Sequence, residues 1–135
     1  MKKTNKGFVT LKTLTEYDNN DNEILRIVYT NRNKELYRIE KKYQNKNIIS
    51  TKHYRFRKLQ SSTNYEYQND NRITELSFDN NNVLIKKLSS QYRNNKLIRE
   101  DLWYRGKHEG FTIYKYDNSG HLIERLTTTP QNKLF

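Results

Sequence analysis

The residues best suited to acid–base or metal chemistry are widely separated in this chain. Its three histidines, His53, His108 and His121, fall in different segments, and no His-x-His or His-x-x-x-His spacing pairs two of them as metal ligands. His108 and Glu109 are expected to lie in a turn and could exchange a proton, but no neighbouring side chain offers a nucleophile. The histidines therefore predict neither a metal site nor a catalytic centre.

The carboxylates point the same way. Glu100 and Asp101 are adjacent, so in a strand they face opposite sides and cannot act as a pair. Asp18, Asp79 and Asp117 each open an Asn-rich or Gly-containing segment, where a short acidic side chain stabilises a turn by bonding its own backbone. Calcium binding needs a denser acidic cluster. With no Gly-rich phosphate loop and no cysteine, we predict a protein that is not an enzyme and has no cofactor.

Aromatic and basic residues, in contrast, are interleaved in ways that suit binding. The segments 52–58 and 104–107 alternate rings with Lys and Arg, a combination that can stack on bases while holding phosphates, or dock on an acidic protein. In the first segment, Tyr54 and Phe56 are expected on one face of a strand, with His53, Arg55 and Arg57 on the other. The candidate partner-binding residues are Tyr54, Arg55, Phe56, Arg57, Trp103, Tyr104, Arg105, Lys107, Tyr114 and Tyr116.

The formal net charge of +11 strengthens this expectation, because a positive field attracts acidic proteins or nucleic acid. The same charges could simply keep a strand-rich surface soluble and guard exposed edges. No segment approaches the roughly 20 apolar residues of a membrane span. We therefore expect a cytoplasmic protein with no membrane partner.

The elements that position these residues follow a rhythm of about twelve residues. Aromatics at positions 17, 29, 43, 54, 67, 78, 92, 104 and 116 are mostly followed by an Asn- and Asp-rich run and then by aliphatic residues. Strand-length runs divided by such turn signals predict antiparallel hairpins. The expected strands are 8–17, 23–30, 35–43, 48–58, 63–68, 72–78, 83–92, 97–104, 111–116 and 121–128, with delayed turns at about 60–64 and at 105–110.

Composition agrees with this all-β prediction. The chain has 11 Tyr and 5 Phe but no alanine, the strongest helix former. We predict one domain over 1–135, with residues 1–7 and 129–135 frayed. Its fold is an antiparallel meander of about nine or ten short strands, as a single twisted sheet or a small barrel or sandwich. Only 33% of the residues are hydrophobic, so any core is small.

The stretch from Trp103 to Leu126 resembles MORN-type repeats of the kind found in bacterial antitoxin and immunity proteins. The matching residues are Gly106, Lys107, Gly110, Tyr114, Tyr116 and Gly120. The segment YDNSGHLIERL within it also resembles the YD repeats of RHS-type toxins. The resemblance covers about a fifth of the chain and implies a β-repeat architecture.

Three functional hypotheses follow. The first is an immunity, antitoxin or inhibitor protein that neutralises an acidic toxin or effector. The second is a nucleic-acid-binding protein that uses a basic, aromatic-rich sheet face. The third is a structural repeat that self-associates into a homo-oligomer through its open sheet edges.

Overall fold

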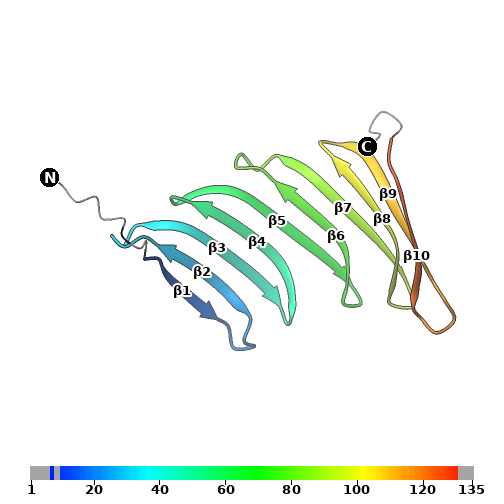
Figure 1. Cartoon of the computed structure of the whole chain (residues 1–135), viewed down its shortest axis with the longest axis horizontal. Helices are drawn as coiled ribbons and strands as arrows, with labels where there is room; N and C mark the ends of the chain where they lie inside the picture. The colour runs from blue at the N-terminus through cyan, green and yellow to red at the C-terminus, as the bar shows by residue number, and fades with distance from the viewer. Residues whose placement is uncertain (1–6, 8–9, 131–135) are drawn as a thin grey trace.

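The structure, a computed structural model, describes residue 7 and residues 10–130, and within them it shows one antiparallel sheet of ten strands and no helix (Figure 1). Each strand pairs with its neighbours in the chain, in the order β1 to β10. The strands are β1 (Lys12–Tyr17), β2 (Glu23–Tyr29), β3 (Glu35–Gln44), β4 (Asn47–Arg55), β5 (Lys58–Gln68), β6 (Asn71–Phe78), β7 (Leu84–Arg93), β8 (Lys96–Tyr104), β9 (Lys107–Tyr116) and β10 (Leu122–Thr128). The all-β meander predicted from the sequence is confirmed.

Polar turn residues bring each strand back beside the last. In the turns Asn69-Asp70 and Asn94-Asn95 both residues have positive φ, between 51° and 63°. This is the backbone of the tight hairpin turn that matches the twist of the flanking strands, and Asn and Asp adopt it at low cost. The Asn-rich runs are therefore turns because their side chains tolerate a conformation that most residues avoid.

Every hairpin also contains a bulge just after its turn. In each of the nine strand pairs the register shifts once, so that one residue of the second strand lies between two successive paired positions. Seven of these nine residues are Ile or Leu. The bulge residues are Ile24, Leu36, Ile49, Gln60, Ile73, Ile85, Ile98, Glu109 and Ile123. The aliphatic residue that follows each polar run in the sequence is thus most often the bulge residue.

The twelve-residue rhythm is half of the true structural repeat, which is a two-strand hairpin. Tyr116 ends a strand that runs towards one long side of the sheet, and Tyr43, Tyr67 and Tyr92 each come one residue before the end of such a strand. Tyr29, Phe78 and Tyr104 end strands that run towards the opposite side, and Tyr54 comes one residue before the end of such a strand. Successive aromatics therefore alternate between the two sides, and those on one side recur about every 24 residues.

The sheet is open and a single layer thick. Within the described residues Ile27, at 4% exposure, is the only buried hydrophobic residue, whereas Glu35, Thr51, Ser62 and Asp101 are buried polar ones. The alternatives of a small barrel or a sandwich are therefore wrong. A barrel or a sandwich needs one mostly apolar face of the sheet to form its core. Here polar and charged residues occupy the middle of both faces.

Two turns differ from their expected positions. The turn expected at 60–64 lies at Phe56-Arg57, so the strand expected at 63–68 already begins at Lys58. The turn expected over 105–110 is only Arg105-Gly106, which places His108 and Glu109 within β9 rather than in a turn. Both differences arise because turns here need only two residues. Most of the ends predicted to fray, residues 1–6, 8–9 and 131–135, lie outside the described part of the chain.

Candidate binding surface on one row of turns

The nine turns form two rows, one along each long side of the sheet (Figure 1). We call the four turns at 30–34, 56–57, 79–83 and 105–106 the upper row. The five turns at 18–22, 45–46, 69–70, 94–95 and 117–121 form the lower row. Because the chain alternates between the rows at every strand, residues far apart in the sequence are collected along the same side.

The two rows carry opposite charge. The upper row contains Arg32, Lys34, Arg57 and Arg105 against Asp79, a net charge of +3. The lower row contains Asp18, Asp21, Asp70 and Asp117 against Lys46, a net charge of −3 with histidine neutral. Exposed Arg55, Lys58 and Lys107 flank the upper turns and extend the positive side. Arg93 and Lys96 likewise flank the 94–95 turn of the lower row, so the difference in charge belongs to the turn residues themselves.

Exposed large hydrophobic residues are also unevenly distributed. Among the described residues there are ten, and six of them belong to the edge strands β1 and β10 or directly precede β1. The other four lie in the upper row or within one residue of it: Phe56 (60% exposed), Val83 (50%), Leu84 (42%) and Tyr104 (47%). Away from the sheet edges, exposed apolar surface therefore coincides with the positive row.

The Phe56-Arg57 turn departs from the preference for Asn, Asp and Gly at positive φ, as Arg105, at φ 49°, also does. Its residues have φ of 49° and 65°, the left-handed region that Asn and Gly favour and a bulky Phe avoids. The Phe56 amide donates to the Leu36 carbonyl at 3.1 Å, and the Arg55 guanidinium lies 5.6 Å from the Phe56 ring centre. The turn thus holds an exposed aromatic ring among three cations at a conformational cost.

The Arg105-Gly106 turn is tied down in the same manner. The Arg105 amide donates to the Ile85 carbonyl at 2.8 Å, and Ile85, like Leu36, is the bulge residue of the preceding upper-row hairpin. The bulge therefore supplies a carbonyl that fixes the next upper turn. This recurring bond holds the backbone of both tight upper turns in place, so their side chains project from a rigid backbone.

Each tight upper turn also borders a small hollow. One, of about 190 Å³, is lined by Glu35, Arg38, Tyr54 and Arg57. There Arg38 contacts Glu35 at 2.5 Å, which raises the pKa of Arg38, and partial burial beside Glu40 raises the pKa of Tyr54. The guanidinium of Arg38 is thereby neutralised by its neighbour.

The second hollow, of about 110 Å³, lies at the upper end of β7 and β8. Its walls are formed by Leu84, Ile85, Lys86, Lys87, Trp103, Arg105 and Gly106. The Lys87 ammonium stands 5.3 Å from the centre of the Trp103 rings. An apolar floor rimmed by cations suits a side chain that carries an apolar body and an acidic or hydrogen-bond-accepting end.

Eight of the ten predicted binding residues are brought to the upper side of the sheet. Tyr54 to Arg57 surround the β4–β5 turn, and Trp103, Tyr104, Arg105 and Lys107 surround the β8–β9 turn. The two groups are separated by four strand spacings, about 19 Å. Val83 and Leu84, which the sequence analysis did not select, lie on the same row between them. The sequence signal that could have placed them there is the spacing of about 24 residues between turns on the same side of the sheet.

Tyr114 and Tyr116 are placed elsewhere. Tyr114 donates its hydroxyl hydrogen bond to Glu100, and Tyr116 donates to the Leu97 carbonyl at 2.6 Å, towards the lower side of the sheet. Glu100 also raises the pKa of Tyr114. Both tyrosines tie β9 to β8 and do not join the upper row.

The expected separation of Tyr54 and Phe56 from Arg55 and Arg57 on opposite faces is wrong for the turn residues. Strand β4 ends at Arg55, so Phe56 and Arg57 protrude from the turn, where strand alternation no longer applies. Ring and cations are therefore presented together rather than apart.

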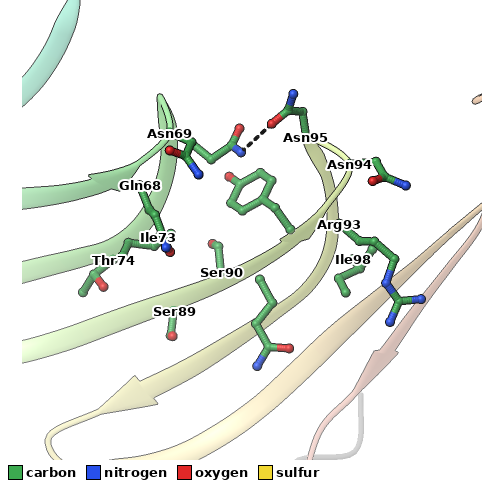
Figure 2. Close-up of a pocket in the computed structure, with 13 residues that line it drawn as sticks. Gln68, Asn69, Ile73, Thr74, Ser89, Ser90, Arg93, Asn94, Asn95 and Ile98 are labelled. Atoms are coloured by element: carbon green, nitrogen blue, oxygen red, sulfur yellow. Dashed lines mark hydrogen bonds between the residues drawn. The ribbon is translucent and has the colours of Figure 1, made fainter.

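The lower row is built differently, and the hollows beside it, of about 490 to 710 Å³, are larger than those of the upper row. Side-chain amides link successive hairpins: Asn22 donates to the Asn45 carbonyl, Asn47 to Asp70 and Asn71 to Asn95, at 2.8 to 3.2 Å. Figure 2 shows the groove beside the last of these bonds, of about 710 Å³, with amide and hydroxyl side chains around it. No exposed large hydrophobic residue lines it.

The histidines and acidic residues have local partners. His108 Nε2 lies 2.9 Å from Asp101 Oδ1, and Arg99 binds the same carboxylate at 2.8 and 3.0 Å and holds the pKa of Asp101 below its usual value. His53 contacts the Tyr37 hydroxyl and His121 lies beside Asp117. Within the described ranges no three His, Cys, Asp or Glu residues are grouped to hold a metal ion.

The three acid-led loops confirm their predicted role. In the loops at 18–22, 79–83 and 117–121 the Oδ1 atom of the leading aspartate accepts from the amides two and four residues ahead. These bonds lower the pKa of Asp117, and the bonds from Asn20 and Asn22 lower that of Asp18 against the opposing effect of burial.

Comparison of the chain with models of known protein families finds no match, and comparison with curated proteins finds none either. In the described residues there is no helix of the length and apolar character needed to cross a membrane.

Proposed function

We propose that this protein is a non-enzymatic binding protein that captures an acidic protein, such as a toxin or effector, through its upper row. The observation that carries the proposal is the coincidence of exposed apolar side chains and positive charge along one side of the sheet. Phe56, Leu84 and Tyr104 supply contact area, and Arg57 and Arg105 supply charge beside them. Aromatic residues and Arg are the types that dominate binding energy at protein interfaces.

The rigidity of the row supports this proposal. Two of its turns are fixed by the backbone bonds to Leu36 and Ile85, so their side chains lose little further freedom on binding. The positive field of the row would also speed encounter with an acidic surface. The stretch from Trp103 to Leu126, which resembles the MORN-type repeats of bacterial antitoxin and immunity proteins, supports an inhibitor role. A cytoplasmic setting is compatible with the cysteine-free sequence.

The test compares two charge-matched variants. Arg57→Glu with Arg105→Glu alters the upper row, and Lys46→Glu with Arg93→Glu alters the lower side by the same charge. Tagged protein captures its partner from host lysate, and the affinity for the purified partner is then measured by calorimetry. We expect the upper-row variant to bind at least tenfold more weakly, about 1.4 kcal/mol, and the lower-row variant to bind like the wild type. Equal losses in both would disprove site-specific capture.

Nucleic acid is the second candidate, favoured by the Phe56 ring held between Arg55 and Arg57. It predicts that capture is lost after nuclease treatment and that affinity falls steeply and log-linearly with salt. A nuclease-resistant, stoichiometric protein partner would instead exclude it as the main function.

A further inference from the structure

The second concentration of exposed apolar surface lies at the sheet edges. Leu11 (52% exposed), Leu14 (40%) and Tyr17 (62%) belong to or adjoin β1, and Leu122, Ile123 and Leu126 belong to β10. Both strands have a neighbour on one side only, so half of their backbone hydrogen-bonding groups face outwards. Unprotected edges of this kind pair with other strands.

We propose that this protein forms a two-fold symmetric dimer in which β1 pairs antiparallel with β1 of a second copy, centred on Leu14. A two-fold axis perpendicular to the sheet places each residue of one edge opposite a fixed residue of the other. With Leu14 opposite itself, Lys12 of one copy lies opposite Glu16 of the other. The sequence LKTLTEY from Leu11 to Tyr17 is self-complementary in this register.

All seven paired positions match. Lys12, Leu14 and Glu16 share one sheet face, as their partners Tyr29, Ile27 and Leu25 show, and on this face the dimer makes one Leu–Leu pair and two Lys–Glu pairs. On the other face Thr13 meets Thr15, and Leu11 meets Tyr17, each pair occurring twice. Opposite-charge, Thr–Thr and apolar pairs are the cross-strand combinations that stabilise sheets.

The other edge pairings are poorer. Two β10 strands centred on Leu126 would place Arg125 opposite Thr127 and Glu124 opposite Thr128, which leaves four charges without opposite-charge partners across the junction. A β10–β1 junction with the rows aligned would pair Leu126 with Leu14 but set Glu124 against Glu16. It would also bring Asp117 near Asp18. Of these three pairings, only β1–β1 balances its charges.

The dimer would extend the sheet and leave the upper-row turns at 56–57, 79–83 and 105–106 open. It therefore does not depend on the proposed function, and it would present two copies of the binding row. A single strand pair buries little surface, and small interfaces of this kind are weak. We therefore expect a reversible dimer with a dissociation constant of about 10–100 µM.

Sedimentation velocity over roughly 5 µM to 1 mM tests the proposal. The wild type should shift from monomer to dimer with concentration. Leu14→Lys places two ammonium groups face to face and should weaken the dimer at least tenfold. Leu126→Lys, the matched change on the other edge, should leave it unaltered. Dimerisation abolished by the β10 change and not by the β1 change would overturn the proposal, as would a wild type that stays monomeric throughout.

A charge swap tests the register itself. Lys12→Glu and Glu16→Lys each create like-charge pairs in their own dimers, so each alone should remain monomeric at concentrations where the wild type dimerises. Mixed in equal amounts, the two variants regain opposite charges at both paired positions and should form a heterodimer about as strong as the wild type. Failure of the mixture to associate would contradict the Leu14-centred register even if the wild type dimerises.

Discussion

Both rows of turns reverse the chain between neighbouring strands, but they do so with different side chains. The lower row uses Asn and Asp at its positive-φ positions and links its hairpins with the side chains of Asn22, Asn47 and Asn71. The upper row places Phe56 and Arg57 at equivalent positions and fixes them through backbone bonds instead. Two of the four upper turns therefore depart from local turn preference and expose aromatic and basic side chains. The other two keep that preference through Asn33 and Asn82, and the lower row keeps it throughout.

This difference separates structure from function within one repeat. A single-layer sheet has no second layer to stabilise it, so the lower row and the cross-strand pairs carry much of its order. A strained turn that survives in such a sheet implies that the side chains are retained for another reason. The proposed binding role would account for both the strain and the exposed ring.

The largest effect is expected from giving an upper-row turn the residue types of the lower row. Replacing Phe56 and Arg57 with Asn and Gly should raise the free energy of unfolding by about 1–3 kcal/mol, because both positions then favour positive φ. The same change should weaken partner binding. Denaturant unfolding measures the first effect and calorimetry the second.

The reciprocal change provides the control. Asn94→Phe with Asn95→Arg imports the upper-row turn into the lower row, and it should destabilise the protein by a similar amount without creating a new binding site. If both exchanges left stability unchanged, the Phe56-Arg57 turn would not be strained.

Acid should loosen two loops of the lower row, those that begin at Asp18 and Asp117. The folded-state pKa values of Asp18 and Asp117 are lowered, so their stabilising effect is fully present above the ordinary aspartate pKa of 3.8 and is lost as pH falls through the lower folded values. Amide exchange at Asn20, Asn22, Ser119 and His121 should therefore lose protection below about pH 4.

Asp117→Asn is the matched variant for that measurement, because its amide oxygen can still accept from Ser119 and His121 but does not titrate in this range. Its loop amides should keep a flatter pH profile below pH 4. Identical profiles in the variant and the wild type would show that protonation of Asp117 is not responsible.

The smallest change in stability is expected from removing one of the side-chain amide bonds that link neighbouring hairpins in the lower row. Asn71→Ala removes the 3.2 Å bond to Asn95 and should lower the free energy of unfolding by about 0.5 kcal/mol, as for an exposed hydrogen bond. Asn81→Ala in the upper row is the control, since Asn81 bonds Asp79 through its backbone amide, which the substitution preserves. Chemical denaturation compares the two, and an equal loss in both would show that the bond between hairpins adds no stability of its own.

The strands, the turn chemistry and eight of the ten residues gathered on one side could be predicted because they depend on local preference. Asn and Asp at Asn69-Asp70 declare a turn by their tolerance of positive φ. Phe and Arg carry no such turn preference at Phe56-Arg57, so the turn was expected at 60–64 instead. Val83 and Leu84 escaped notice because a single exposed aliphatic residue carries no signal until its neighbours in space are known.

By itself, the sequence determined an antiparallel meander, since its turn residues recur too often for anything but short hairpins. Whether that meander closed, and which turns shared a side, depended on the three-dimensional arrangement. Each hairpin reverses the chain, so contacts along a row join residues about 24 positions apart, beyond the reach of local patterns. Polar residues at the middle of both faces left the sheet no apolar side to fold over, and it stayed open.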